Sequence, residues 1–199
     1  MKQKRFVVEL NGPDTVTFLP PSSDLKNTDW EIRVCFIDAN QAQANPSQIL
    51  RILDSASSLK LALAITVDKK LTMELWNGAT WVYGVTTSTT YNNSYNSVVI
   101  RKVGASISLK AIGETKTIPT TSSWTYAQIE SVRISDINAD VRPIRICGIK
   151  QSLNNVDVDK FSCTEESGIS LENSINPTRQ AILSDVNAHV GDLVPVALL

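Results

Sequence analysis

The sequence Leu59–Val85, LKLALAITVDKKLTMELWNGATWVYGV, contains the pattern that decides the fold. From Leu59 to Val67 every second residue is large and apolar, and alanine or a polar residue stands between. The same alternation returns in Leu71–Trp76. A period of two places one row of side chains against a core and leaves the other row facing water, which is typical of a half-buried β-strand. We therefore predict two antiparallel strands, each with one apolar face.

A β-hairpin turn is predicted directly after these two strands. Asn77-Gly78 lies between Trp76 and Ala79. This dipeptide suits a two-residue turn because both turn positions need positive φ. The segment 79–85 then folds back onto the strand before it, and the sequence predicts an antiparallel meander over 59–85.

Shorter alternating segments, separated by turn residues, occupy most of the remaining chain. The segment 48–54 fits either a helix or a strand, as short apolar runs often do. We interpret it as a strand because its neighbours are strands. The other expected strands cover residues 6–10, 15–19, 30–37, 97–103, 106–112, 115–118, 128–135, 142–150 and, weakly, 160–163.

Local signals refine three of these strand ends. Tight turns are predicted at Gly104-Ala105 and at Gly113-Glu114, where glycine supplies the conformation that the turn needs. Ile129 is out of phase with Val132 and Ile134, which predicts a β-bulge near Glu130-Ser131.

Together the segments predict an all-β fold. Roughly a dozen short strands, with turn signals every 8–12 residues and no convincing helical period, are typical of an antiparallel two-sheet sandwich or jelly roll. We expect the jelly-roll sandwich domain to occupy residues 1–163. The strand pattern fades over 164–199, which ends in the apolar sequence LVPVALL. We expect this C-terminal tail to pack on the sandwich or on a neighbouring subunit.

Composition and charge narrow the function. Of the 199 residues, 42% are hydrophobic and 20% are charged, as in folded globular proteins. The formal net charge of −1 argues against nucleic acid as a partner, because binding to a phosphate backbone needs a basic surface. The N-terminal sequence MKQKRFVVELNG has too short an apolar run for a signal peptide or a membrane span. We therefore expect synthesis in a cytoplasm and no membrane insertion.

Cys35, Cys147 and Cys163 are an odd number of cysteines without metal-binding spacing. Cys35 and Cys147 each lie in an expected strand, so we interpret them as small buried thiols rather than as a structural disulfide. A nucleophilic thiol is disfavoured because the one histidine, His189, lies far along the chain.

Residues 95–117 resemble the central hairpins of the laminin-G-like branch of concanavalin A-like jelly rolls. The shared order is an aromatic and Asn loop, the strand VVIRK, a one-Gly turn, the strand ISLKA and a second Gly turn. Trp30–Phe36 is similar to the first long inner strand of that family, and Arg142–Gln151 to its closing strand. FSCTEESGISLEN at 161–173 is similar to a tail that often follows this domain in phage and bacterial surface proteins. Ile112-Gly113-Glu114 departs from the family, which usually has Asp-Gly there.

The resemblance implies a concanavalin A-like jelly roll that binds carbohydrate or protein surfaces. In phages such domains recur, often as oligomers, in tail, fibre and capsid-decoration proteins. Together with the lack of a secretion signal, this predicts a non-enzymatic virion protein, structural or adhesive in role, that is made in the host cytoplasm. Its expected partners are other virion proteins, copies of itself in a homo-oligomer, and a cell-surface glycan. A free carbohydrate-binding lectin is the alternative.

No cofactor is expected. Some members of the family hold calcium, for which this chain offers the carboxylates of Asp38, Asp54, Asp136 and Asp140. These lack the regular oxygen spacing of a dedicated calcium loop, so we interpret them as solvated turn formers.

Enzyme activity is not expected either. Glycosidases of this family carry the pattern E-x-D-x-x-E, which places two carboxylates on one face of a strand so that both reach the cleft. Glu9, Glu31, Glu74 and Glu130 stand singly. A glycan hydrolase is the least favoured alternative, because a fold does not by itself imply catalysis.

Two tryptophans are the leading candidates for ligand binding. Trp76 and Trp81 flank the predicted turn, and rings that both faced water would form a platform on which a sugar stacks. Glu74 or Tyr83 would supply hydrogen bonds. The alternative is that the two rings serve packing, either against each other across the hairpin or beneath the second sheet.

Further candidates follow from position. Recognition residues concentrate in loops, and the aromatic residues in or beside expected loops are Tyr91, Tyr95, Trp124 and Tyr126. Their alternative role is to anchor those loops. Arg101 would neutralise an acidic sugar, or it is a solvated charge at a strand end.

Overall fold

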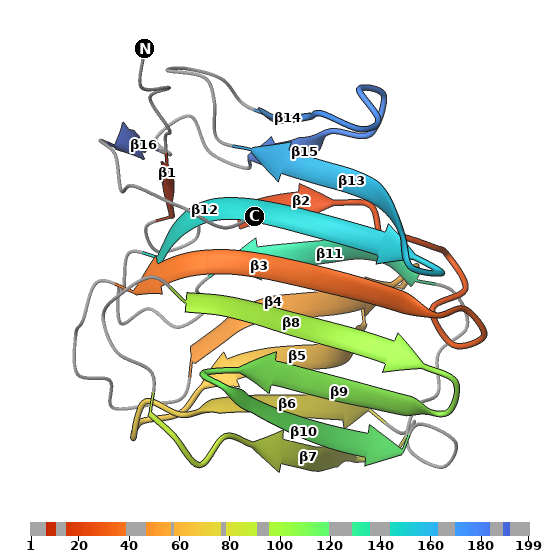
Figure 1. Cartoon of the computed structure of the whole chain (residues 1–199), viewed down its shortest axis with the longest axis vertical. Helices are drawn as coiled ribbons and strands as arrows, with labels where there is room; N and C mark the ends of the chain where they lie inside the picture. The colour runs from red at the N-terminus through yellow and green to blue at the C-terminus, as the bar shows by residue number, and fades with distance from the viewer. Residues whose placement is uncertain are drawn as a thin grey trace.

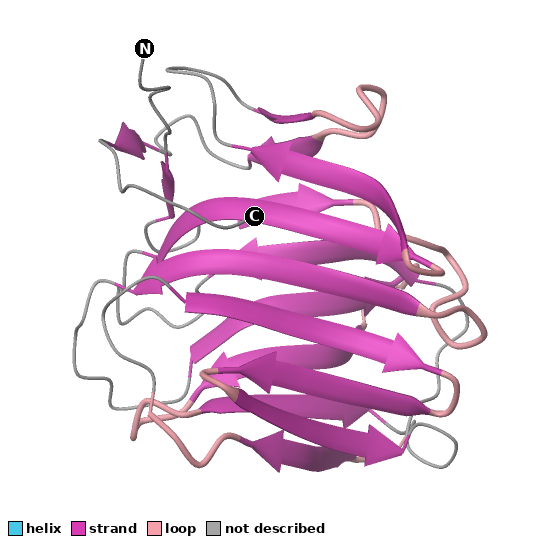
Figure 2. Ribbon diagram, in the orientation of Figure 1, coloured by secondary structure: helices cyan, strands magenta, loops and turns pink. Residues whose placement is uncertain are grey.

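The computed structural model describes residues 7–10, 15–38, 47–56, 58–76, 79–90, 96–119, 129–135, 144–162, 170–183 and 189–191. Every regular element in these ranges is a β-strand (Figure 2), and accordingly no helix in them is long and apolar enough to cross a membrane. The strands are β1 (Val7–Leu10), β2 (Thr15–Phe18), β3 (Trp30–Asp38), β4 (Ser47–Asp54), β5 (Leu59–Ile65), β6 (Leu71–Trp76), β7 (Trp81–Thr86), β8 (Asn96–Val103), β9 (Ser106–Ala111), β10 (Glu114–Pro119), β11 (Ile129–Ser135), β12 (Ile144–Leu153), β13 (Val156–Ser162), β14 (Ser170–Asn173), β15 (Ala181–Leu183) and β16 (His189–Gly191).

The strands form two antiparallel sheets that face each other (Figure 1). The front sheet has the order β10-β9-β8-β3-β12-β13, and the back sheet has the order β15-β2-β11-β4-β5-β6-β7. β14 pairs with β13 and with β15, and so links the two sheets along one edge. β1 pairs with the first residues of β12 and with β16. This arrangement confirms the predicted antiparallel two-sheet sandwich, and β4 confirms the strand interpretation of 48–54.

The core lies between the two sheets. Trp30, Ile32, Val34 and Phe36, the inner row of β3, are all buried, as is the inner row of β6, Leu71, Met73 and Leu75. A fully buried side chain of this size contributes roughly 1.5–3 kcal/mol. The alternation seen in the sequence is therefore a main source of stability.

The outer row of β5 differs from the prediction. The alternating pattern predicts that Ala62 and Ala64 face water, but their exposed fractions are 0% and 2%. Ala62 lies between its cross-strand neighbours Arg51 and Glu74. These side chains are much longer than a methyl group, so an alanine between them is shielded from water.

The turn after β6 is also longer than predicted. Trp76 pairs with Trp81, so the residues 77–80 connect the strands, whereas the prediction was a turn of Asn77-Gly78 alone. Asn77 and Gly78 lie outside the described residues. A cross-strand pair of aromatic rings adds roughly 0.5–1.5 kcal/mol beyond its burial, which favours the observed register.

Two tight turns of the front sheet contain a glycine with positive φ. Gly104-Ala105 connects β8 to β9 as predicted, with Gly104 at a φ of 54°. The next turn is Ile112-Gly113 and not Gly113-Glu114, because Glu114 already pairs with Ala111 in the ladder. Ile112 has a φ of 55°, which costs an L-residue with a side chain roughly 1–2 kcal/mol.

The β12–β13 hairpin extends beyond the predicted strands. β12 continues to Leu153, which pairs with Val156, and Asn154-Asn155 forms the turn. Both asparagines have positive φ, 49° and 64°, a conformation that Asn tolerates better than most residues. This hairpin was not predicted from the sequence because residues 154–160 are mostly polar, although Asn-Asn is a turn signal.

Besides two register shifts between β4 and β5, two β-bulges bend the back sheet. The predicted one lies in β11, where the register with β4 shifts between Ile129 and Ser131. The other lies in β7, where Val85 pairs with Met73 but Tyr83 pairs with Glu74, so Gly84 is the extra residue. Glycine within a strand often marks a bulge or a close approach of another group.

Strands β7 and β10 lie side by side where the two sheets meet at the lower edge in Figure 1. Gly84 of β7 packs against Ile118 of β10, so closely that a Cβ atom on Gly84 would lie 1.6 Å from Ile118 Cδ1. The carboxylate of Glu114 accepts hydrogen bonds from the N–H groups of Ser88, at 2.9 Å, and Thr89. These contacts close this edge of the sandwich.

The Glu114 contacts make the closed edge sensitive to acid. Hydrogen bonds from Thr89 and Ser88 lower the pKa of Glu114 from its ordinary 4.5 to about 2. Because the pKa is lower in the folded state, the stabilisation is complete above pH 4.5 and is lost as the pH falls toward 2. We expect the melting temperature of the wild-type protein to exceed that of Glu114→Gln at pH 7, and the difference to shrink between pH 4.5 and pH 2. A difference that stays constant over this range would contradict the assignment.

The segment after β13 returns to the sandwich through β14 and β15. The loop between these strands is fixed by Arg179, whose Nη2 donates to Asp159 Oδ2 at 2.9 Å and to the carbonyl oxygen of Pro20 at 2.6 Å. Asp159 is fully buried, and it also accepts hydrogen bonds from Gln151 at 2.9 Å and Asn173 at 2.6 Å. The predicted C-terminal tail, 164–199, thus contains β14, β15 and β16. Its residues 164–169, 184–188 and 192–199, and the predicted boundary between residues 163 and 164, lie outside the described residues.

Candidate functional site

The outer face of the front sheet, the face that points away from the core, carries aligned polar and charged side chains. Because successive residues of a strand point to opposite faces, the residues between the core positions of β3 point outward, and these are Glu31 and Arg33. The registers of β9, β8, β12 and β13 align further outward residues with these two. The result is two rows that cross five strands.

The first row, here called the basic row, consists of Lys110, Val99, Arg33, Lys150 and Lys160. Four of its five members are cationic. Neighbouring strands are about 4.8 Å apart, so the row spans roughly 19 Å. Within the described part of the chain, neither Lys110 nor Lys160 forms an ion pair.

The second row, here called the mixed row, consists of Ser108, Arg101, Glu31, Ser152 and Asp157. Across both rows five basic residues stand against two acidic ones, a net charge of +3, whereas the whole chain has −1. This face is therefore a local positive region on a slightly acidic protein.

Ion pairs join the two rows. Arg33 Nη2 lies 3.1 Å from Glu31 Oε1, and Lys150 Nζ lies 2.8 Å from Asp157 Oδ2. The hydrogen bond from Lys150, together with one from Ser152, lowers the pKa of Asp157. Asp157 is therefore ionised at neutral pH and holds Lys150 in place.

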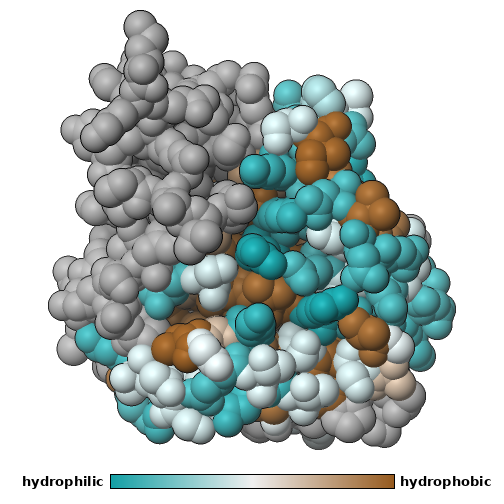
Figure 3. Space-filling model, viewed as in Figure 1, coloured by the Kyte–Doolittle hydropathy of each residue, from teal (hydrophilic) through white to brown (hydrophobic). Residues whose placement is uncertain are grey.

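Two adjoining hollows lie over the rows and together form what we call the front groove. The larger has a volume of about 560 Å³ over β3, β8 and β9, and the smaller has about 200 Å³ near the β12–β13 turn. Glu31 and Arg101 line both hollows, and the described side chains on this side of the molecule are largely hydrophilic (Figure 3). The front groove is lined by Asp29, Glu31, Arg33, Ser97, Val99, Arg101, Ser108, Lys110, Thr115, Lys150, Ser152, Asn155 and Asp157, among others.

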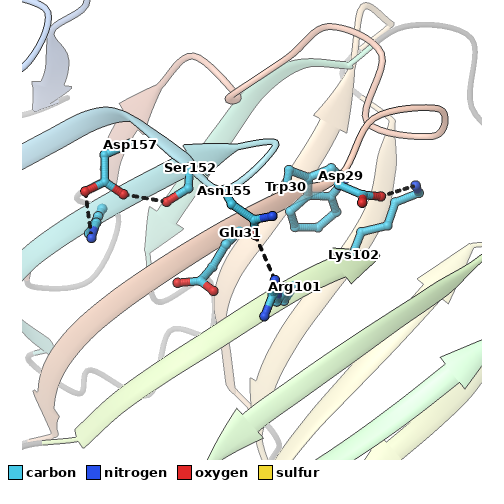
Figure 4. Close-up of a pocket in the computed structure, with 9 residues that line it drawn as sticks. Asp29, Trp30, Glu31, Arg101, Lys102, Ser152, Asn155 and Asp157 are labelled. Atoms are coloured by element: carbon cyan, nitrogen blue, oxygen red, sulfur yellow. Dashed lines mark hydrogen bonds and ion pairs between the residues drawn. The ribbon is translucent and has the colours of Figure 1, made fainter. Parts of the chain in front are cut away.

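One end of the front groove is rigidly built. Figure 4 shows Arg101 and Asn155 meeting across it, and Arg101 Nη2 donates to Asn155 Oδ1 at 2.8 Å. Asp29 is bonded to the turns of both neighbouring hairpins, β8–β9 and β12–β13. Its carboxylate accepts a hydrogen bond from Gly104 N–H, and its carbonyl oxygen accepts one from Asn154 N–H, each at 2.8 Å. The side chain of Lys102 is 2% exposed and donates to the carbonyl oxygen of Thr28 at 3.0 Å. Groups fixed in this way lose little freedom when a ligand binds.

The predicted tryptophan pair lies elsewhere, at the end of the β6–β7 hairpin in the back sheet. Trp76 and Trp81 contact each other edge to face, with ring centroids 5.4 Å apart and an interplanar angle of 60°. Both are partly exposed. Burial raises the pKa of Glu74, which lies on the same strand face as Trp76. The pair thus packs across the hairpin, and two tilted rings do not form one flat platform.

The remaining predicted site residues are not placed together. Tyr83 pairs with Glu74 through its backbone, but its side chain lies outside the described residues, as do Tyr91, Tyr95, Trp124 and Tyr126. Their roles in ligand binding stay predictions. Of the candidates named from the sequence whose side chains are described, Arg101 is the one that lines the front groove.

Among the predicted turn-forming aspartates and buried thiols, the structure describes the side chains of Asp54 and Cys35. Asp54 accepts hydrogen bonds from Ala56 and Ser58 N–H and pairs with Lys60 at 3.1 Å, so it forms a turn as predicted. It is 8% exposed, however, and is therefore buried rather than solvated as predicted. In the described ranges no group of three or more His, Cys, Asp or Glu residues is placed to hold a metal ion; Asp136 and Asp140 lie outside them. Cys35 is a buried free thiol, as predicted.

The other groove residues were not recognised from the sequence. Arg33, Lys110 and Lys150 each occupy an outward position in an alternating strand, where a charged residue is ordinary. Only the pairing of β9, β8, β3, β12 and β13 places them on one line, and strand order is not visible in the residue pattern. The signal available beforehand was that the outward positions of these strands are basic more often than acidic.

The comparisons with known proteins concern the fold. No family model matches the chain, and a search of curated proteins found no match. A native heptameric SAP-like pentraxin from Limulus polyphemus is 11% identical, with a TM-score of 0.53 over 76% of this chain and 77% of that chain. A family 7 alginate lyase in complex with substrate is 8% identical, with a TM-score of 0.51 over 65% of this chain and 62% of that chain. The match thus spans 62% of the lyase.

A third structure is the CBM2 module of an evolved Dit protein from Lactobacillus casei BL23 phage J-1. It is 11% identical, with a TM-score of 0.49 over 70% of this chain and 69% of that chain. The first two similarities are in fold and not in sequence. The class that fold and topology define is an antiparallel concanavalin A-like jelly-roll sandwich.

Proposed function

We propose that this protein is a non-enzymatic carbohydrate-binding jelly-roll module whose ligand lies in the front groove. The observation that carries the proposal is the groove itself, an open hollow lined with hydroxyl, amide, carboxylate and guanidinium groups on rigid strands. Sugars present many hydroxyl groups, each able to donate and accept hydrogen bonds. A surface with donors and acceptors in fixed positions complements such a ligand.

The state of the groove carboxylates supports a binding role over a hydrolytic one. A glycosidase needs a carboxyl group with a raised pKa as general acid. The ion pair with Lys150 lowers the pKa of Asp157 instead, and Glu31 is paired with Arg33. Turnover of any polysaccharide by the pure protein would overturn this part of the proposal.

The proposal includes a particle-borne context. The order of hairpins in 95–117 and the sequence at 161–173 support a subunit of a phage tail, fibre or decoration protein, assembled with other virion proteins or with copies of itself. Its ligand would then be a cell-surface glycan. The alternative is a free lectin, which would bind its ligand in the same groove but would not be part of a virion.

A bulky side chain in the groove tests the binding site. We expect Ser108→Tyr to weaken binding to every glycan that the wild-type protein binds on an array by at least tenfold, because the ring fills the larger hollow. Tyrosine is favoured in strands, so the free energy of unfolding should change by less than about 0.5 kcal/mol. Affinity is measured by titration calorimetry with the best glycan of the array.

Two matched variants complete the test. Thr86→Tyr adds the same ring to an exposed strand position of the back sheet, and binding should be unchanged. Trp76→Ala should also leave binding unchanged. If Trp76→Ala abolishes binding while Ser108→Tyr does not, the ligand lies at the tryptophan hairpin and the front-groove proposal is wrong.

A further inference from the structure

We propose that the ligand of the front groove is an anionic polysaccharide, a polymer bearing carboxylate or sulfate groups, which lies across the strands along the basic row. This inference rests on the proposed function and names the ligand class. It is carried by the alignment of Lys110, Arg33, Lys150 and Lys160 on one line across neighbouring strands.

The spacing of the charges favours a polymer over a small anion. Arg33, Lys150 and Lys160 come from adjacent strands and so recur about every 4.8 Å, and Lys110 lies about two strand spacings from Arg33, beyond Val99. These spacings are comparable to the advance of one and of two units of an extended polysaccharide. A small anion would be held by two or three convergent donors. The basic row instead presents its cations side by side along a line.

The charge balance favours an anionic polymer over a neutral one. Arg33 and Lys150 have carboxylate partners in the mixed row, but Lys110 and Lys160 have none in the described part of the chain. Like charges aligned on one face repel each other and destabilise the sheet. Two uncompensated lysines beside two further cations are thus a cost that an anionic ligand relieves.

The neighbouring mixed row fits the rest of such a ligand. Ser108 and Ser152 offer hydroxyl groups, and Glu31 offers a carboxylate that accepts from sugar hydroxyls. Val99, the apolar member of the basic row, is 9% exposed and lies between Lys110 and Arg33. The described side chains of this face therefore combine cations with sugar-binding groups, whereas a surface for single-stranded nucleic acid combines cations with exposed aromatic rings.

Lys110→Gln with Lys160→Gln tests the inference, because among the described residues neither lysine has an ion-pair partner whose loss would disturb the fold. We expect the affinity of the full-length protein for polygalacturonate, alginate or dextran sulfate to fall about tenfold, and binding of the wild-type protein to weaken as salt is raised. Polygalacturonate and alginate report on carboxylate recognition and dextran sulfate on sulfate recognition. The matched control is Lys26→Gln with Lys70→Gln, which removes the same charge outside the row and should leave affinity unchanged.

A gain of affinity provides a second test that misfolding cannot imitate. Glu31→Gln removes a negative charge next to the basic row and releases Arg33, but it keeps a side-chain oxygen that accepts from sugar hydroxyls, so affinity for the same anionic polymers should rise by about threefold. A decrease would contradict the inference.

The outcomes separate this inference from the proposed function. If the protein binds uncharged dextran or carboxyl-reduced polygalacturonate as tightly as the anionic polymers, and Ser108→Tyr abolishes that binding, the groove binds sugar but the inference is wrong. If single-stranded nucleic acid binds more tightly than every polysaccharide, the inference is wrong as well. If no glycan binds, the proposed function itself fails.

Discussion

Replacing Arg179 with methionine is expected to lower the free energy of unfolding by about 3 kcal/mol. The guanidinium of Arg179 is the cation that compensates the carboxylate of Asp159, to which it donates from Nε and Nη2 at 2.9 Å. Asp159 is completely buried. Removal of one partner of a buried ion pair typically costs about 3–5 kcal/mol, because the other charge is left uncompensated. We expect the lower end of that range, since Gln151 and Asn173 still donate to the carboxylate.

Urea denaturation measures this effect, as a shift of the midpoint at an unchanged slope. Arg101→Met is the matched control, because Arg101 is exposed and its guanidinium makes one hydrogen bond to a described residue, Asn155. Its change should stay below about 1 kcal/mol. Combining Arg179→Met with Asp159→Asn should recover part of the loss, as the uncompensated charge is then absent. A loss for Arg179→Met no larger than that of the control would show that the carboxylate does not depend on this cation.

The second large effect is expected at the closed edge of the sandwich, where Gly84→Ala should cost about 1–3 kcal/mol. A Cβ atom on residue 84 would lie 1.6 Å from Ile118 Cδ1 and 2.4 Å from its Cγ1. Ile118 is 5% exposed, so it has little room to move. Forcing an extra methyl group into a packed core costs energy of this order.

A double-mutant cycle with Ile118→Val checks the mechanism by denaturation. Valine lacks the Cδ1 atom that the new methyl group would meet. Ile118→Val alone should cost about 0.5–1.5 kcal/mol, but in the Gly84→Ala background its cost should be smaller or reversed. Additive effects of the two substitutions would rule out a direct clash between residues 84 and 118.

The sequence predicted the sandwich because its strands alternate clearly. In β3, for example, Trp30 to Phe36 alternate with Glu31 and Arg33, and the buried row is the apolar one. Turn positions were predicted less well. A turn is decided by which two residues pair at its base. The pairing of Ala111 with Glu114, and that of Trp76 with Trp81, cannot be read from the alternation of residues along the sequence.

The candidate site was harder to predict than the fold for the same reason. Trp76 and Trp81 stand close together in the sequence and are visible as a pair, but the structure shows them packed against each other. The basic row joins Lys110 to Lys160, residues 50 positions apart, through three intervening strands. Arg101 was a candidate from the sequence, but the sequence does not show which residues lie beside it in the groove. Sites assembled across a sheet need strand order, which depends on long-range packing.

The linking strand β14 gives the sandwich the character of a flattened barrel with a single seam. The hydrogen-bonded ladder starts at β10, passes through both sheets by way of β14, and ends at β7, which lies next to β10. Among the described strands, the main ladder is therefore interrupted only where Ile118 and Glu114 hold its two ends together. Opening the molecule between its layers should begin at that seam, and a strand from another protein that extends the main ladder would have to join it there.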